Sequence, residues 1–287
     1  MPTLVSQLAA RTLEWLPRKQ LSRGMGGLAS RATGRRVLAG AVGLYVRAYD
    51  VDLNEADVPI DGFRTFDEFF TRRLKPGQRP IEGDARTLVS PADGRVEDAG
   101  EVRPDGRFFV KGSEYSATQL LGDASDAARF EGGRFAIVYL SPRDYHRVHA
   151  PVTGSVHTVR HVGGTLLPVN AFGLANYPGL FARNERVAIF QENAEHGEVA
   201  TVMVGAIGVG RISVAFDASI MTNVGRGPTT VRYAAGERPT LERGDELGMF
   251  HLGSTAIVFV GPHADLEWTV RAGQSIRMGR ALAHGVG

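Results

Sequence analysis

The sequence predicts an α+β protein, with a helical N-terminal region followed by a mainly antiparallel β-domain of the sandwich or barrel-like type. Apolar residues recur at helical spacing through residues 1–50. From residue 85 onward, short runs of β-branched and aromatic residues alternate with glycine and proline. The composition, 43% hydrophobic and 22% charged, is that of a folded globular chain. We therefore expect two parts, residues 1–84 and residues 85–287.

The first predicted helix begins after Thr3, a possible N-cap, and ends at Pro17. Its stripe holds a tryptophan beside cations, and consists of Leu4, Val5, Leu8, Thr12, Trp15 and Leu16. This pattern describes a helix that lies in a membrane interface. It equally describes an amphipathic helix docked on the protein's own core, so both interpretations stay open.

Two further helices follow a glycine-broken stretch. The stretch contains Gly24, Gly26 and Gly27. A second helical stripe comprises Val37, Leu38, Ala41, Leu44, Tyr45 and Ala48. Thr65 and Glu68 then form a capping box ahead of a short helix that carries Phe66, Phe69 and Phe70.

The predicted β-domain is a series of short runs. They are Phe108–Lys111, Phe135–Leu140, Val152–Val162, Arg186–Gln191, Val199–Phe216, Ala256–Val260 and Leu266–Val270. Two segments, Pro91–Val96 and Pro151–Val156, share a Pro-x-x-Gly-x-Val frame. Proline at a turn, glycine at positive φ and a following strand would give a hairpin. The two copies could reflect a quasi-symmetric β-sandwich, and chance repetition of so short a frame is the alternative.

Charge is distributed unevenly along the chain. The net charge is +2, yet residues 1–49 hold eight arginine and lysine residues against Glu14 alone, which leaves a net charge of −5 for the remainder. A basic arm on a mildly acidic body predicts an anionic partner, either lipid or nucleic acid. No apolar run reaches the roughly 18 residues of a membrane span, and Arg11 and Glu14 interrupt any signal-peptide core.

The residue inventory excludes several kinds of chemistry. The absence of cysteine excludes disulfides, thiolate metal sites and cysteine nucleophiles. The only lysines are Lys19, Lys75 and Lys111, which limits the candidates for a pyridoxal Schiff base.

The Gly253-Ser254 bond is a candidate site of backbone cleavage. It lies where a short turn leads into the apolar run Ala256–Val260. Glycine leaves its carbonyl open to attack and tolerates strained dihedral angles, and the Ser254 hydroxyl can attack that carbonyl from within the chain. An ordinary turn before a strand is the alternative, because Gly-Ser pairs are common in loops.

Asp93 and His149 supply the other parts of a nucleophile, base and orienter triad with Ser254. Asp93 lies in a Pro-Ala-Asp-Gly turn, where it could instead form only an Asx-turn. His149 and His146 are three residues apart and could be metal ligands or polar residues at a strand end. We expect no metal, because only Asp144 lies near enough in sequence to complete such a site.

Taken together, these motifs resemble the phosphatidylserine decarboxylases of the membrane-associated bacterial type. The matching segments run nearly end to end: Arg64–Phe70, Pro91–Gly94, Tyr145–Pro151, Leu167–Asn170, Phe181–Arg186 and Gly248–Thr255. The family's catalytic positions are all matched. Differences within Phe250–Leu252 are expected to leave the chemistry unaffected.

The resemblance implies a serine-protease-like self-cleavage by Asp93, His149 and Ser254. Asp93 would orient His149, which would act as general base on Ser254. Attack on Gly253 would give an ester, and its elimination would leave a pyruvoyl group at position 254. The products would be a β chain of residues 1–253 and an α chain of residues 254–287, associated as a heterodimer and compatible with a homodimer of such heterodimers.

The resemblance also implies the activity of the mature enzyme. Phosphatidylserine would form a Schiff base with the pyruvoyl cofactor, lose CO₂ and leave as phosphatidylethanolamine, a step of phospholipid biosynthesis. His146 would handle substrate or protons. The basic arm would bind the anionic membrane surface, which places the enzyme as a peripheral protein on the cytoplasmic face of the bacterial cell membrane.

Two other classes of protein share parts of this pattern. Pro-x-x-Gly-x-Val turns also occur in lipoyl-, biotinyl- and sugar-phosphotransfer-type β-folds, in which His149 could accept phosphate or Lys111 could carry a prosthetic group. Nucleic-acid binding by the basic arm lacks the aromatic and basic interleaving that stacking requires, so we expect no nucleic-acid partner.

Overall fold

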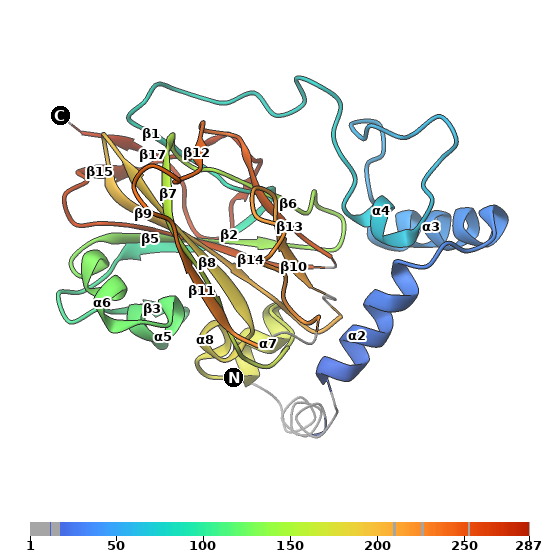
Figure 1. The fold of residues 1–287 in the computed structure, drawn as a ribbon, viewed down its shortest axis with the longest axis horizontal. Helices are drawn as coiled ribbons and strands as arrows, with labels where there is room; N and C mark the ends of the chain where they lie inside the picture. The colour runs from blue at the N-terminus through green and yellow to red at the C-terminus, as the bar shows by residue number, and fades with distance from the viewer. Residues whose placement is uncertain (1–11, 13–17, 209–210, 225–226, 252, 287) are drawn as a thin grey trace.

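The computed structural model describes Thr12 and residues 18–208, 211–224, 227–251 and 253–286. Its first helices are α2 (Arg18–Ala29), α3 (Arg35–Tyr49) and α4 (Phe66–Phe70). Figure 1 shows them gathered at one end of the molecule, from which the chain crosses to β1 on the far side. The helix expected before Pro17 lies outside the described residues, apart from Thr12. None of the described helices is long and apolar enough to cross a bilayer.

The strands and small helices of the remaining chain have the following bounds. The strands are β1 (Thr87–Val89), β2 (Gly94–Glu101), β3 (Arg107–Val110), β4 (Ser113–Ser116), β5 (Arg134–Leu140), β6 (Arg147–His149), β7 (Gly154–Val162), β8 (Arg186–Asn193), β9 (Gly197–Val204), β10 (Ile212–Val214), β11 (Thr229–Arg232), β12 (Thr240–Leu241), β13 (Glu246–Phe250), β14 (Ser254–Val260), β15 (Leu266–Trp268), β16 (Ser275–Ile276) and β17 (Ala281–Gly285). The helices are α5 (Ala117–Leu121), α6 (Ala124–Ala127), η1 (Ala128–Phe130), α7 (Ala171–Asn176) and α8 (Leu180–Arg183).

A nine-stranded sheet organises the β-domain. Its strand order is β11-β7-β8-β9-β14-β5-β2-β16, with β12 also paired to β7. Every ladder between these strands is antiparallel. Two three-stranded sheets, β10-β13-β6 and β1-β17-β15, accompany it. The predicted antiparallel fold is confirmed, but the described strands form open, layered sheets and no closed barrel.

The two faces of the large sheet bury different cores, because side chains alternate along each strand. One face, which includes Phe135 and Ile137 of β5, packs on the β3–β4 hairpin and helices α5 to α8. The other face, which includes Leu140, packs on the β10-β13-β6 sheet at one end and on the β1-β17-β15 sheet at the other. The active-site candidates lie at the end covered by β6 and β13.

The predicted helices and strands agree with the structure in part. Helix α3 and the Thr65 cap of α4 are confirmed, and the Thr65 hydroxyl accepts a hydrogen bond from the Glu68 N–H at 3.0 Å. The expected break at the glycines after Arg23 is wrong, because α2 runs through them. The run Val199–Phe216 is two strands, β9 and β10, rather than one.

The glycines of the repeated Pro-x-x-Gly-x-Val frame share a steric role. Each begins a strand, β2 at Gly94 and β7 at Gly154. A Cβ on Gly94 would lie 2.2 Å from the Tyr139 carbonyl oxygen, and one on Gly154 would lie 2.5 Å from that of Glu192. Only Gly94 has a positive φ, so the expectation of positive φ at both is wrong. Close approach of the neighbouring strand explains the repeated glycine.

Candidate active site

Ser254 is the first residue of β14, a central strand between β5 and β9. Its side chain is 0% exposed, and its hydroxyl has no hydrogen-bond partner among the described residues. Gly253 precedes it with a φ of 31°, and apart from its chain neighbours no described atom lies within 4 Å of where a Cβ would be. The structure therefore places a hydroxyl without a hydrogen-bond partner among the described residues directly after a glycine with open space where a side chain would be.

Strand register determines which face of the sheet Ser254 occupies. Ser254 pairs directly with Leu140, and residues opposite each other in an antiparallel pair project to the same side. Leu140 packs in the core that also contains Val148 and Ala150, the two neighbours of His149. Ser254 and His149 thus belong to the same end and the same side of the β-domain.

His149 ends β6 and is only 8% exposed. Its Nδ1 atom lies 2.7 Å from the Gly244 carbonyl oxygen, and its Nε2 atom lies 3.0 Å from the Tyr145 hydroxyl. Because a carbonyl can only accept, Nδ1 carries the proton, and in the neutral ring Nε2 accepts from Tyr145. Burial lowers the pKa of His149, although Gly244 and nearby acidic groups oppose the shift. The ring is therefore neutral at physiological pH, with its basic nitrogen at Nε2.

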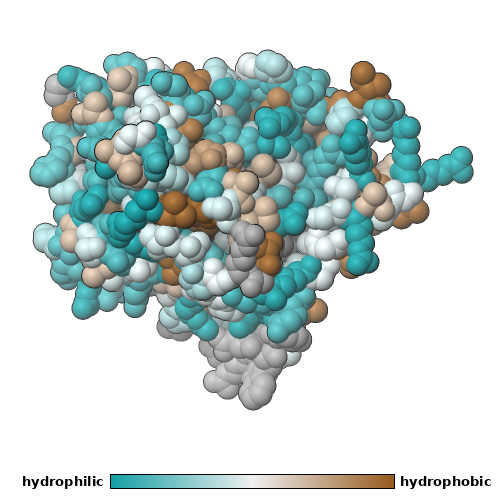
Figure 2. Space-filling model, in the orientation of Figure 1, coloured by the Kyte–Doolittle hydropathy of each residue, from teal (hydrophilic) through white to brown (hydrophobic). Residues whose placement is uncertain are grey.

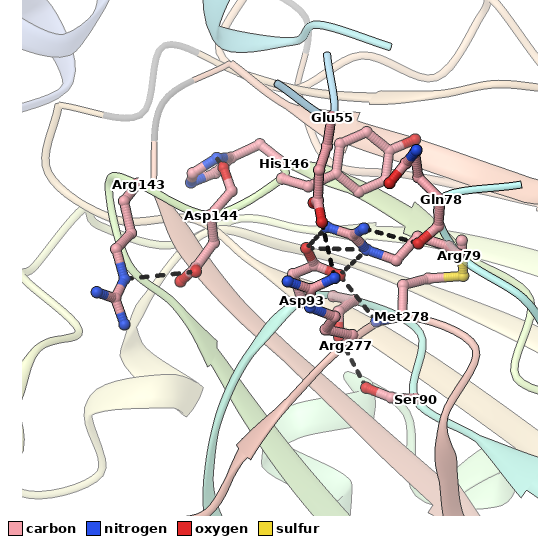
Figure 3. Close-up of polar contacts among 12 residues, drawn as sticks. Glu55, Gln78, Arg79, Ser90, Asp93, Arg143, Asp144, His146, Arg277 and Met278 are labelled. Atoms are coloured by element: carbon pink, nitrogen blue, oxygen red, sulfur yellow. Dashed lines mark hydrogen bonds and ion pairs between the residues drawn. The ribbon is translucent and has the colours of Figure 1, made fainter. Parts of the chain in front are cut away.

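Asp93 lies close to His149 but makes its hydrogen bonds elsewhere. The Arg79 Nε atom donates to its carboxylate at 2.8 Å, and the Met278 N–H donates at 2.8 Å (Figure 3). The His149 N–H donates to the Pro91 carbonyl at 2.8 Å, which joins the Asp93 turn to β6. Asp93 acts on His149 through space, raising its pKa against the larger effect of burial. The expected orienting hydrogen bond is replaced by the one to the Gly244 carbonyl.

His146 is completely buried, and its two ring nitrogens differ sharply. Nδ1 donates to the Asp144 carbonyl at 2.7 Å, whereas Nε2 has no hydrogen-bond partner among the described residues. The ring centroid lies 4.1 Å from that of Phe70. Burial, with a smaller contribution from Arg72, lowers the pKa of His146 to about 3. The geometry leaves one unshared electron pair on Nε2 for a reacting group.

This burial predicts an acid-dependent stability. As pH falls from about 6.5 toward about 3, the unfolded chain takes up a proton at His146 and the folded chain does not. The free energy of unfolding should therefore fall by up to about 1.4 kcal/mol per pH unit from this one group. Urea unfolding of wild type and His146→Gln across this range measures the difference. The matched control is His263→Gln, at an exposed position, and equal pH slopes for wild type and His146→Gln would contradict the prediction.

A cavity of about 490 Å³ lies beside these groups. Its lining includes Arg72, Arg79, Asp93, Tyr139, Asp144 and Tyr145. Ser254, His146 and His149 are absent from the described lining. Tyr145 connects the two regions, because it faces the cavity and its hydroxyl contacts His149. The cavity therefore gives solvent access to the Asp93 side of the site.

Two arginines that organise this site were missed from the sequence. Arg79 bridges Asp93 and Glu55, with its Nη2 atom 2.8 Å from the Glu55 carboxylate. Arg72 is 5% exposed and donates to the carbonyl oxygens of Arg143 and Asp144 at 3.0 and 3.3 Å. A cation two residues after the buried aromatic pair Phe69-Phe70 was the available signal for Arg72. Arg79 precedes a proline in a segment without periodicity and gave no comparable signal.

The alternative of a lysine carrier receives no support from the position of Lys111. Lys111 and Gly112 have φ values of 47° and 81° and connect β3 to β4. The Lys111 ammonium forms an ion pair with Glu97, whose side chain is 1% exposed. A carrier lysine must be free to move with its prosthetic group, whereas this one is bound at the β2 strand. Elsewhere, the described residues contain no group of three or more histidine or acidic side chains placed to hold a metal ion.

Comparison with known proteins identifies the family of this chain. The sequence profile of the phosphatidylserine decarboxylase family matches residues 66–284. This chain is 44% identical to the phosphatidylserine decarboxylase proenzyme of Bordetella avium and 40% identical to that of Brevibacillus brevis. Each alignment covers 93% of this chain, and they cover 91% and 94% of the two relatives, respectively. A proenzyme of the same name from a Shewanella species is 41% identical over 94% of each chain.

The family match spans helix α4, the Asp93 turn, His146 and His149, and the Gly253-Ser254 bond. The matched chains are nearly equal in length, so the similarity covers the whole architecture rather than one motif. The chain belongs to the phosphatidylserine decarboxylase family.

Proposed function

We propose that this protein cleaves itself between Gly253 and Ser254 and then, using a pyruvoyl group made from Ser254, converts phosphatidylserine to phosphatidylethanolamine and CO₂. The observation that carries the proposal is the buried, unpartnered Ser254 hydroxyl directly after Gly253, which has no side chain to obstruct attack on its carbonyl. A buried hydroxyl without a partner costs roughly 1–3 kcal/mol, a cost that Ser254 shares with Thr201 and Thr255 but incurs directly beside the candidate cleavage bond. Family membership supports the same chemistry.

Self-cleavage begins with proton removal from Ser254. The Nε2 atom of His149 is the basic atom, and it exchanges its hydrogen bond with Tyr145 for one with Ser254. The serine oxygen attacks the Gly253 carbonyl, the C–N bond breaks, and the nitrogen of residue 254 takes a proton, which leaves an ester. General-base assistance of this kind contributes roughly 10²–10⁴-fold to a rate.

The second stage removes the upstream chain. Loss of the Cα proton of residue 254 expels Gly253 as a carboxylate and leaves a dehydroalanine. Tautomerisation to an imine and addition of water then release ammonia and leave the ketone of the pyruvoyl group. Residues 1–253 and 254–287 stay associated as a heterodimer, because β14 lies within the large sheet.

The proposed protein has two parts, a helical region of residues 1–84 and a β-rich catalytic domain of residues 85–287.

The surroundings of residue 254 suit a pyruvoyl group. The position is fully buried, and His146, which directly precedes β6, carries no charge at physiological pH. When formed, the group supplies an electron sink for decarboxylation, the role that pyridoxal phosphate fills elsewhere. His146 holds its proton at Nδ1 through the Asp144 carbonyl and offers Nε2 for proton transfer. Its neutral state at physiological pH keeps that atom available to accept a hydrogen bond from the substrate.

The helical end of the molecule is the proposed membrane-binding surface. Leu21, Met25 and Leu28 of α2 recur at helical spacing and are 44%, 50% and 65% exposed. Val37 and Leu44 of α3 are 69% and 68% exposed. Figure 2 shows that the face of the molecule toward the viewer is mostly hydrophilic and that its apolar residues lie in small separate groups. Apolar residues among arginines favour a peripheral position on the anionic cytoplasmic surface of the membrane.

Removing the apolar stripe of α2 should weaken membrane binding. We expect the variant Leu21→Ser, Met25→Ser, Leu28→Ser to bind vesicles of phosphatidylglycerol and phosphatidylcholine at least about tenfold more weakly, because three side chains no longer enter the interface. Vesicle co-sedimentation measures this. Phe109→Ser is the matched control, since Phe109 is 43% exposed but lies in β3. Equal loss in both variants, or no loss in the α2 variant, would contradict the proposed surface.

Intact-mass spectrometry of the purified protein tests the whole proposal. We expect two fragments, one ending at Gly253 and one beginning at residue 254 with the mass of a pyruvoyl group in place of serine. The smaller fragment should resist sequential N-terminal degradation, because it has no free amine. An intact, lipid-active chain with an unmodified Ser254 would refute the mechanism.

A further inference from the structure

His251, three residues before Ser254, is held by a hydrogen-bonded network that the proposed mechanism does not use. Its Nδ1 atom lies 2.8 and 3.0 Å from the two carboxylate oxygens of Asp67 in α4. Its Nε2 atom lies 3.0 Å from the Ser213 hydroxyl in β10. The side chain of His251 is about 10% exposed. We call Asp67, Arg211, Ser213 and His251 the His251 anchor.

The protonation of this anchor follows from its partners. An ionised carboxylate can only accept a hydrogen bond, so Nδ1 of His251 carries a proton and donates a hydrogen bond to Asp67. Burial disfavours the Asp67 carboxylate, but the hydrogen bonds and charges of His251 and Arg211 outweigh burial, and the pKa of Asp67 is lowered. The carboxylate is therefore ionised at neutral pH, and the hydrogen bond that it accepts from His251 is charge-assisted.

The anchor joins three distant parts of the chain. Arg211 Nη2 donates to Asp67 at 3.1 Å and to the Ser30 hydroxyl at 3.1 Å. The backbone N–H of His251 donates to the Arg211 carbonyl at 3.0 Å. His251, two residues before Gly253, is thereby held at two points. Its side chain is bound to α4 of the N-terminal region, and its backbone is bound to the residue before β10.

The neighbouring Gly253 explains why such fixation matters for the reaction. Gly253 has no side chain, has a left-handed φ and has open space around it. Downstream, the chain is held by the ladders of β14. Among the described residues, His251 is the nearest upstream position with side-chain hydrogen bonds. Attack within a chain requires the carbonyl carbon to be held about 3–3.5 Å from the oxygen, and a 1 Å misplacement can cost about 10²-fold.

We propose that Asp67 and His251 are positioning residues for self-cleavage, which hold the Gly253 carbonyl in reach of Ser254. The inference rests on the proposed function, since it concerns the same bond. It assigns a role to His251, which lies within Phe250–Leu252, where sequence differences were expected to leave the chemistry unaffected. Ser213, Asp67 and His251 have the composition of a second triad, but Ser213 only completes the anchor and is not a nucleophile.

Cell-free synthesis of the full chain with phosphatidylglycerol vesicles, followed by gel analysis over time, measures the rate of cleavage. We expect Asp67→Ala and His251→Leu to cleave about tenfold to a hundredfold more slowly than wild type. His251→Asn should cleave within about threefold of wild type, because its side-chain N–H can replace Nδ1 in the bond to Asp67. Ser213→Ala should also stay within about threefold, because only the weaker bond is lost.

Glu68→Ala is the matched control for loss of a carboxylate and for weakening of α4. Glu68 neighbours Asp67 and accepts a hydrogen bond from the Arg64 N–H at the start of that helix. We expect cleavage of this variant at the wild-type rate, together with equal or greater loss of thermal stability than in His251→Leu. If cleavage rates across the variants followed thermal stability alone, the positioning role would be overturned.

The possible failures are distinguishable. Wild-type rates in both Asp67→Ala and His251→Leu would overturn the anchor and leave self-cleavage standing. A loss in Ser213→Ala as large as in His251→Leu would also overturn it, because Ser213 would then take part in the reaction. A wild-type chain that stays intact would overturn both proposals. If Asp67→Ala does not fold, the contrast between His251→Leu and His251→Asn decides the question.

Discussion

Ser254→Ala should remain a single chain and show no decarboxylation above background. The substitution removes the only oxygen that can attack Gly253 from the next residue, and with it the precursor of the ketone. We expect the folded protein to be as stable as the uncleaved wild-type chain or more stable, because a buried hydroxyl without a partner costs roughly 1–3 kcal/mol. Gel analysis, release of labelled CO₂ from phosphatidylserine and urea unfolding measure the three effects.

Thr201→Val provides the matched control. Thr201 is also fully buried, its hydroxyl also has no partner among the described residues, and it lies in β9 beside β14. This variant should cleave and decarboxylate as wild type does. Cleavage of Ser254→Ala at the same bond would sink the mechanism, because no other side chain can replace the nucleophile without moving the chain.

Asp93→Asn should slow self-cleavage at least tenfold at pH 7 and also destabilise the fold. Asp93 is, after Glu246, the second acidic group that opposes the burial-induced fall in the pKa of His149, so its charge supports the protonated state formed during the reaction. Burial lowers the pKa of Arg79, but its bonds to Asp93 and Glu55 outweigh burial and raise it. Breaking such a buried pair costs about 3–5 kcal/mol, and the remaining Glu55 contact places the loss at the lower end.

Glu55→Gln separates these two effects. It removes the other carboxylate on Arg79 and should destabilise the fold comparably, but Glu55 is not among the charges that act on His149. We expect its cleavage rate to be close to that of wild type. Equal slowing in both variants would show that Asp93 acts only by holding Arg79. Normal cleavage of Asp93→Asn would remove Asp93 from the catalytic group.

Local sequence patterns predicted the elements that depend on local chemistry. The apolar run after Ser254 is a central strand, and the Thr65 hydroxyl caps α4 as expected. The helix through Gly24, Gly26 and Gly27 was not predictable in this way, because glycine disfavours helix and tertiary contacts stabilise α2 here. One such contact is the hydrogen bond from the Gly208 N–H to the buried Ser22 hydroxyl.

The sequence suggested the residues of the candidate site but not their hydrogen bonds. His149 is oriented by the Gly244 carbonyl, and every residue has a carbonyl, so no pattern of side chains could reveal this partner. Asp93 was expected to bond to His149, whereas Arg79, fourteen residues before it, occupies its carboxylate. The His251 anchor depends on residues 184 and 38 positions apart, which only the folded chain brings together.

The position of β14 has a consequence for how the processed protein can unfold. The ladder with β5 extends over Ser254–Val260 and the ladder with β9 over Thr255–Val260, while β17 pairs with β1. The proposed cleavage before Ser254 would turn these intrachain ladders into contacts between two polypeptides, and unfolding would become dissociation. Refolding changes from first order to second order, so the thermal midpoint of the processed protein should rise with protein concentration while that of the precursor should not. The proposed maturation would thus convert a single folded chain into a complemented pair of fragments, and folding would have to precede the cut.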